Sequence, residues 1–172
     1  MKAILAAVLA MAAAVATATE PPLRPWTASA TPPLALQDLA GGKVDLHSLQ
    51  GRVVVVNFWA TWCEPCTAEM PALQRLQERM RGKPFDVLAV NYGESAAKVD
   101  GFLRKSGLAL HVLLDPDKRA ADAWSAKGLP MTFVVDRGGR VRFWVFGERD
   151  WSRGDSLAAI EKLVDETGHA GR

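Results

Sequence analysis

Two cysteines, Cys63 and Cys66, are the residues whose type and spacing point most directly to chemistry. They are the only cysteines among 172 residues, and Cys-x-x-Cys spacing allows a disulfide between neighbours on the first turn of a helix. The apolar run 53–59 just before them predicts a strand that leads into this helix. Unpaired N–H groups and the positive end of the helix dipole stabilise an anion there, so a thiol at the helix start ionises more readily than a free thiol. The pattern therefore predicts a redox-active cysteine pair.

The two thiols are expected to have different roles in disulfide exchange. Cys63 lies nearest the helix end, so we expect its thiolate to attack the substrate. Cys66, one turn further in and less exposed, would attack the resulting mixed disulfide and release the substrate as a dithiol. Pro65 suits the first helical turn, where its missing N–H costs no hydrogen bond. The reversible disulfide Cys63–Cys66 is the only redox group that this chemistry needs, so no further cofactor is expected.

Two plainer explanations of the cysteine pair are less favoured. A zinc site needs four ligands, and the three histidines, His47, His111 and His169, are scattered without ligand spacing. A structural clip of this spacing closes too short a loop to stabilise the fold much. A metal or copper carrier that uses the two thiols alone remains an alternative to a redox enzyme.

Composition indicates one globular domain with a full core. Hydrophobic residues make up 49% of the chain and charged residues 23%. The formal net charge is +2, and loss of Lys2 with a leader would leave 20 basic against 19 acidic residues. A balance so close to neutral gives no indication of a nucleic acid or an anionic membrane surface as partner.

Residues 1–18 have the pattern of a secretory signal peptide. Lys2 precedes the alanine-rich apolar run 3–16, and Ala16-Thr17-Ala18 is a small-x-small cleavage site. We expect cleavage after Ala18 and a soluble periplasmic protein. The alternative is an uncleaved membrane anchor, although the stretch is weakly apolar and at the short end of the roughly 17–25 residues that span a bilayer. Export would place the cysteines where disulfides persist.

The rest of the chain divides into a linker, a domain and a tail. Five prolines among residues 19–33 predict an extended linker, the domain is expected over 34–167, and 168–172 are expected to form a flexible tail. The amino-terminal half of the domain predicts a hairpin of 34–36 and 43–46, a turn at 47–50, a strand at 52–59, a helix at 67–80 kinked at Pro71, and a strand at 85–92. The other half predicts a helix at 95–105, a strand at 112–114, a helix at 118–127, a hairpin of 131–135 and 141–146, and a helix at 152–167 with a Ser152/Asp155 capping box and Gly168 as its stop.

Strand, helix and strand within about forty residues form a βαβ unit, so the strands at 52–59 and 85–92 should be parallel. Loops that leave the carboxyl ends of parallel strands open at one edge of the sheet, where sites form. The loop with Cys63 and the loop 92–95 should therefore lie on the same side. Glu94 becomes a candidate neighbour of the dithiol.

The segments 58–66 (FWATWCEPC) and 128–133 (GLPMTF) resemble the thioredoxin superfamily, and more closely its exported TlpA/ResA-like thiol-disulfide oxidoreductases. The resemblance covers about 34–167 and implies an α/β, thioredoxin-like fold, in which helices flank a mixed central sheet with an N-terminal β-hairpin extension and a central αβ insertion. It also implies that Pro130 follows a cis peptide and that the backbone of Leu129 pairs with the substrate. Met131 stands where many members have threonine. Trp62, Leu129 and Met131 would form the apolar contact around the dithiol.

Asn57 departs from the pattern of cytoplasmic thioredoxins, which carry a buried aspartate at this strand position as the proton acceptor of the inner cysteine. An amide cannot titrate, so another group must do this work. The resemblance of the segment 90–95 to its ResA-type counterpart implies that Glu94 is the acid/base group. We expect partial burial to raise its pKa.

The direction of electron flow follows from the residue between the cysteines. Strong oxidants place a histidine there, whereas the negative charge of Glu64 opposes a thiolate and makes the dithiol more reducing. We therefore expect a protein-disulfide reductase that needs a membrane electron donor. The resemblance implies apocytochrome c or copper-site cysteines of exported proteins as substrates. A thiol peroxidase is the enzymatic alternative, but the proline and threonine usual in peroxiredoxins are replaced here by Val56 and Ala60.

Overall fold

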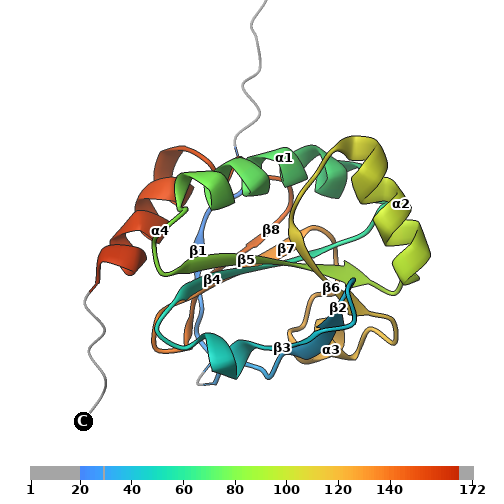
Figure 1. Ribbon diagram of the computed structural model, residues 1–172. Coiled ribbons are helices and arrows are strands. Elements are labelled where there is room, and N and C mark those ends of the chain that lie inside the picture. Colours follow the sequence, from blue (N-terminus) through green and yellow to red (C-terminus); the bar gives the residue numbers. More distant parts are fainter. Residues whose placement is uncertain (1–19, 29, 167–172) are drawn as a thin grey trace, which may run out of the picture.

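A single mixed sheet of eight strands organises the computed structural model, which describes residues 20–28 and 30–166. The strand order is β1-β8-β7-β4-β5-β6-β2-β3. Helices α1, α2 and α4 cover one face, and the short α3 lies on the other (Figure 1). The elements in chain order are β1 (Arg24–Pro25), β2 (Ala35–Asp38), β3 (Lys43–Asp45), a 3-10 helix (Leu46–Leu49), β4 (Val53–Trp59), α1 (Glu64–Arg79), β5 (Phe85–Tyr92), α2 (Ala96–Ser106), β6 (His111–Asp115), α3 (Arg119–Ala123), β7 (Met131–Val135), β8 (Val141–Phe146) and α4 (Gly154–Asp165).

Strand β4 is the centre of the sheet, and all seven of its residues are buried. It runs parallel to β5, as the βαβ pattern predicts, and antiparallel to β7. Val55 and Trp59 join the core under α1 and α4, while Val56 and Phe58 join the core on the α3 side. A strand covered on both faces needs apolar side chains at nearly every position, which explains its continuous apolar sequence.

Helix α1 begins at Glu64, three residues before the start expected from the apolar pattern, and Cys63 is its N-cap. It continues without interruption past Pro71 to Arg79. The early start places both cysteines at the amino end of a sixteen-residue helix. That is the position at which a thiolate gains most from the helix dipole.

Part of the expected linker at 19–33 packs on the domain. β1 pairs antiparallel with β8, and the N–H of Trp26 donates to the carbonyl of Arg142 at 3.0 Å. The indole of Trp26 meets the ring of Phe133 edge-on, with centroids 5.7 Å apart. Prolines are tolerated on an edge strand, where the missing N–H would face solvent. We call residues 20–28 the N-terminal strap.

Two helices are shorter than their apolar spacing predicts. Helix α3 covers five residues, because Ser125 adopts a left-handed φ of 54° and the N–H of Ala126 closes on the carbonyl of Ala121 at 2.8 Å. Glycine is the usual residue at this position of a helix-ending motif, so the serine did not indicate where the helix ends.

Helix α4 begins at Gly154, and the expected capping box is absent. The hydroxyl of Ser152 donates to Asp150 at 2.6 Å, and Asp155 pairs with Arg149 instead of reaching back to the helix start. The remaining expected strands and the hairpin of β2 and β3 are present with small shifts at their ends. The expected signal peptide, the stop at Gly168 and the tail lie outside the described residues.

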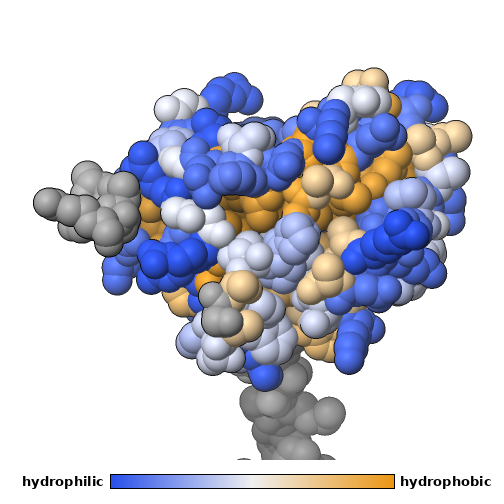
Figure 2. Space-filling view, turned by 90° about the horizontal axis from the view of Figure 1, so that it is seen from below, coloured by the Kyte–Doolittle hydropathy of each residue, from blue (hydrophilic) through white to orange (hydrophobic). Residues whose placement is uncertain are grey.

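Apolar surface remains exposed on this fold. Figure 2 shows hydrophobic residues gathered in one continuous area, bordered by hydrophilic ones, on the face seen from below. Across 20–28 and 30–166, two large hydrophobic side chains are more than half exposed, Trp62 at 62% and Phe146 at 54%. No helix in this part of the chain is long and apolar enough to cross a membrane.

Candidate active site

The sulfur atoms of Cys63 and Cys66 are joined in a disulfide at the start of α1, with their Cα atoms 5.2 Å apart. The N–H of Cys66 donates to the sulfur of Cys63 at 3.3 Å, and the N–H of Thr67 donates to the carbonyl of Cys63 at 3.0 Å. Cys63 therefore caps the helix through its sulfur. When the disulfide is opened, the same N–H and the helix dipole can stabilise a thiolate at this atom.

The two cysteines differ in exposure in the direction that the exchange mechanism requires. Cys63 is 6% exposed and Cys66 is fully buried. Glu64 and Pro65, between them in the first turn, are both exposed, and Trp62 extends into solvent beside them. The geometry leaves Cys63 as the sulfur that a partner can reach.

The Leu129–Pro130 segment forms the loop before β7 and contains the cis peptide that the resemblance implies. Its successor Met131 pairs with Phe58 of β4, five residues before Cys63, and this register brings the loop to the edge of the sheet where the dithiol lies. Leu129 is partly buried and packs against the core cluster that contains both cysteines. Pro130 and Met131 are buried.

Glu94 lies near the dithiol loop, but its environment contradicts the expected raised pKa. The carboxylate accepts hydrogen bonds from the N–H and the hydroxyl of Thr61, both at 2.7 Å, and from Asn91 at 2.9 Å. It also pairs with the ammonium of Lys98 at 2.7 Å. Burial alone would raise the pKa of Glu94, but the bonds from Lys98, Asn91 and Thr61 outweigh it and lower the pKa to about 2. A carboxylate with so low a pKa is a weak base at neutral pH, which disfavours the acid/base role that was expected of it. Its bonds instead hold Thr61, two residues before Cys63.

A second glutamate, Glu69, has the property that was expected of Glu94. It lies one turn after Cys66 on α1, is 2% exposed, and accepts a hydrogen bond from the amide of Asn57 at 2.7 Å. Its other oxygen accepts from the N–H of Arg149 at 3.1 Å and from the indole of Trp151 at 3.3 Å. Burial disfavours the charged form and raises the pKa of Glu69 to about 8, because these neutral donors offset only part of the cost.

Asn57 connects Glu69 to the strand beside the cis-proline loop. Its amide N–H₂ donates both to Glu69 and to the hydroxyl of Thr132, the latter at 2.9 Å, and its carbonyl oxygen has no partner in the described part of the chain. Asn57 itself cannot titrate, but its amide holds the carboxyl group of Glu69, which can.

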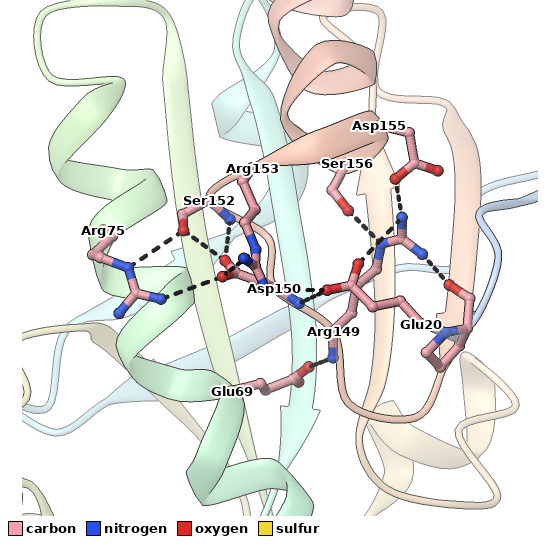
Figure 3. Close-up of polar contacts among 10 residues, drawn as sticks. Glu20, Glu69, Arg75, Arg149, Asp150, Ser152, Arg153, Asp155 and Ser156 are labelled. Atoms are coloured by element: carbon pink, nitrogen blue, oxygen red, sulfur yellow. Dashed lines mark hydrogen bonds and ion pairs between the residues drawn. The ribbon is translucent and has the colours of Figure 1, made fainter. Parts of the chain in front are cut away.

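Figure 3 shows the bond from the N–H of Arg149 to Glu69 and the polar contacts around Arg149. The guanidinium of Arg149, whose side chain is 3% exposed, bonds to Asp155, to Ser156 and to the carbonyl of Pro21 in the N-terminal strap (Figure 3). The backbone N–H that Glu69 accepts thus belongs to a residue whose side chain is held by α4 and the strap. The position of this donor depends on segments that are distant in sequence.

The position of Glu69 in the helical pattern could have identified it as a candidate site residue. Helical spacing places position 69 on the same face as Cys66, Leu73 and Leu76, which are all buried. An acid on the buried face of a helix is unusual and indicates a functional or paired group. Among residues 20–28 and 30–166, no group of three or more His, Cys, Asp or Glu side chains could hold a metal ion.

Comparisons with known proteins identify the family of this chain. The model of a family described as AhpC/TSA matches residues 27–144. The thiol-disulfide oxidoreductase ResA of Bacillus subtilis is 36% identical over 113 residues, which is 66% of this chain and 63% of that protein, slightly less than two thirds of its length. ResA of Geobacillus thermodenitrificans is 34% identical over 119 residues, which is 69% of this chain and 68% of that protein.

Solved structures give the same result. A thiol:disulfide interchange protein DsbE from Chlorobium tepidum is 31% identical with a TM-score of 0.66, covering 77% of this chain and 91% of its own. A secreted thiol-disulfide isomerase from Corynebacterium glutamicum is 27% identical with a TM-score of 0.71, covering 78% and 85%. With a disulfide at the start of α1, a thioredoxin-like sheet and these similarities, the chain belongs to the AhpC/TSA family and carries the domain of a ResA-like thiol-disulfide oxidoreductase.

Proposed function

We propose that this protein reduces disulfides in other exported proteins by exchange at Cys63 and Cys66. The observation that carries the proposal is the position of the pair: a barely exposed sulfur at the N-cap of α1, bonded to a fully buried sulfur one turn deeper. A buried glutamate with a raised pKa lies on the next turn of the same helix. Attack, resolution and proton transfer each have a candidate group.

The exchange begins with the reduced form. The Cys63 thiolate attacks one sulfur of a substrate disulfide, whose S–S bond breaks as the mixed disulfide forms, and the released substrate thiolate takes a proton. Cys66 then loses its proton and attacks the sulfur of Cys63. This step forms the Cys63–Cys66 disulfide and releases the second substrate thiolate, so two electrons pass to the substrate.

Glu69 is the group that we assign to proton transfer for Cys66. A pKa of about 8 leaves it mostly protonated at neutral pH but able to give up and take back a proton near the operating pH, which favours acid/base catalysis. Residues three apart on a helix are neighbours, so Glu69 lies on the same buried face of α1 as Cys66. Glu94 would act by positioning Thr61 and the approach to Cys63.

The substrate would contact the surface around Cys63. Exposed Trp62, the backbone of Leu129 at the cis-Pro130 loop and the apolar side chain of Met131 are the proposed contacts. Glu64 opposes a thiolate and favours the reducing direction. The protein would therefore work as a periplasmic reductase, with apocytochrome c or copper-site cysteines as substrates and a membrane donor of electrons.

Trapping in the native host tests the proposal. Cys66→Ala should accumulate substrates as mixed disulfides on Cys63, whereas the control Cys63→Ala should accumulate few. Equilibration against glutathione should give a potential well below the roughly −120 mV of strong oxidants. Consumption of peroxide by the reduced protein, or tight stoichiometric metal binding without any exchange, would support the peroxidase or the metal carrier instead.

A further inference from the structure

An apolar groove of about 400 Å³ lies beside the cis-proline loop, between β8 and the N-terminal strap. Trp144 and Phe146 of β8 and Pro21 and Pro22 of the strap line it, together with Met131. Phe146 is 54% exposed, so a large ring faces solvent in the groove. The redox pair does not use these aromatic side chains.

The groove is continuous with the loop that is proposed to hold the substrate. Met131 pairs with Phe146 across β7 and β8, and the N–H of Gly147 donates to the carbonyl of Pro130 at 2.9 Å. Phe146 lies directly on Gly128, since a Cβ at position 128 would come within 2.5 Å of the ring. A chain segment bound at Leu129 therefore needs to continue only a short way to reach the Phe146 ring.

The charge of the groove is positive. Arg24 and Lys127 line it, and no acidic residue does. Within the described residues, neither cation has a carboxylate within 4.0 Å, and the guanidinium of Arg24 lies 5.2 Å from the centroid of the Trp144 ring. The other large groove against the strap, of about 480 Å³, differs: its lining includes Glu20, Glu69, Glu148 and Asp150.

From this combination we infer that the groove, with Phe146 as its apolar contact and Arg24 and Lys127 as its charges, binds an extended segment of the substrate protein that carries an acidic residue next to a large apolar one, close to the substrate disulfide. Apolar burial against Phe146 and Trp144 supplies affinity, and the two cations select the sign of the charge. The inference rests on the proposed function, because it places this segment beside the exchanging cysteine. It predicts that disulfides next to an acidic residue and a large apolar residue are reduced fastest.

Two peptide disulfides of equal length test the inference, one with Glu-Phe and one with Lys-Ser beside the cysteine. The wild-type protein should reduce the Glu-Phe peptide about tenfold faster in kcat/KM at low salt, and the difference should shrink at high salt. Arg24→Glu with Lys127→Glu should abolish the preference, and Phe146→Ser should weaken it at any salt concentration. The control pair Lys43→Glu with Lys83→Glu makes the same change in net charge outside the groove and should leave the preference intact.

Two further measurements keep the test decisive. Lys127→Glu alone, in a residue that belongs to no strand, replaces the double variant if loss of Arg24 loosens the strap. Reduction of uncharged hydroxyethyl disulfide should be equal in all these variants.

Titration calorimetry with cysteine-to-serine versions of the peptides measures docking without exchange. If the wild-type protein exchanges no disulfide but still binds the Glu-Phe peptide preferentially, the proposed function fails and the docking site stands. Equal rates and affinities for both peptides, or a preference that survives in the double variant and in Lys127→Glu, would overturn the inference.

Discussion

Glu69 and Glu94 are both buried glutamates close to the dithiol, and their pKa values are shifted in opposite directions. They are 2% and 8% exposed, so burial alone does not separate them. Glu94 lies at the carboxyl edge of the sheet, where the exposed Lys98 can reach it, and its pKa falls to about 2. Glu69 lies on the buried face of α1 with hydrogen bonds from neutral donors only, and its pKa rises to about 8.

The groups that contact a buried carboxylate decide its role. A neighbouring cation and several donors stabilise the charged form, so Glu94 is a permanent acceptor that fixes the Thr61 backbone. Neutral amide and indole donors stabilise the charge less than water does, so Glu69 keeps its proton until mildly alkaline pH. The first arrangement suits positioning and the second suits proton transfer.

The largest expected effect is on the pH dependence of stability through Glu69. Its pKa is raised in the folded protein, so the free energy of unfolding should fall as pH rises from about 4.5 to about 8 and then level off. Glu69→Gln should remove this fall, which amounts to on the order of 3 to 5 kcal/mol between these limits. Denaturant unfolding of the oxidised protein at a series of pH values measures it. A wild-type profile as flat as that of Glu69→Gln would show that the two glutamates do not differ as described.

The next effect is on catalysis. Glu69→Gln should lower the rate of disulfide exchange about 100-fold and move the thiol titration of Cys66, because a general acid/base group is lost. Stopped-flow exchange and thiol alkylation against pH measure both quantities. Glu78→Gln, on an exposed position of the same helix, is the control and should behave like the wild-type protein.

Loss of Glu94 should affect stability more than exchange. Glu94→Gln removes the charge that pairs with Lys98 and one of the two oxygens that accept from Thr61, which should cost about 2 kcal/mol at neutral pH while exchange changes by less than a few-fold. Since the pKa is lowered in the folded state, the stabilising contribution of Glu94 is present above about pH 4.5 and is lost as pH falls toward 2. The difference between wild type and variant in denaturant unfolding should therefore shrink below pH 4. A large loss of exchange with normal stability would return the acid/base role to Glu94.

The smallest effect concerns Lys98, the cation that pairs with Glu94 and has no counterpart at Glu69 among the residues that the structure describes. Lys98→Met should raise the pKa of Glu94 and cost at most about 1 kcal/mol, because the ammonium is 55% exposed and solvent screens the pair. Carbon-detected NMR titration of the Glu94 carboxyl group measures the shift. Lys105→Met, on the same helix, should leave this titration unchanged, and an equal shift in both variants would mean that Lys98 is not the decisive partner.

Much of the fold and of the dithiol was predictable because the signals are local. The apolar run of β4 and the hairpin of β7 and β8 each depend on neighbouring residues, and the structure has them where they were expected. Helix α1 follows β4 as expected but begins three residues earlier than its apolar pattern predicts. The capping box at Ser152 did not form because nearby partners compete for both of its side chains: Asp155 pairs with Arg149, and the hydroxyl of Ser152 donates to Asp150. The N-terminal strap was missed because its pairing partner, β8, lies more than a hundred residues away.

The redox pair, its place at a helix start and the thioredoxin-like order of elements are all predictable from local sequence patterns. The different pKa values of the two glutamates depend on contacts that form only in the folded protein. A pKa depends on solvent access and on the groups that the fold brings within a few ångströms, and for Glu69 these are Asn57 on β4 together with Arg149 and Trp151, about eighty residues further along the chain. No pattern of neighbouring residues contains that information.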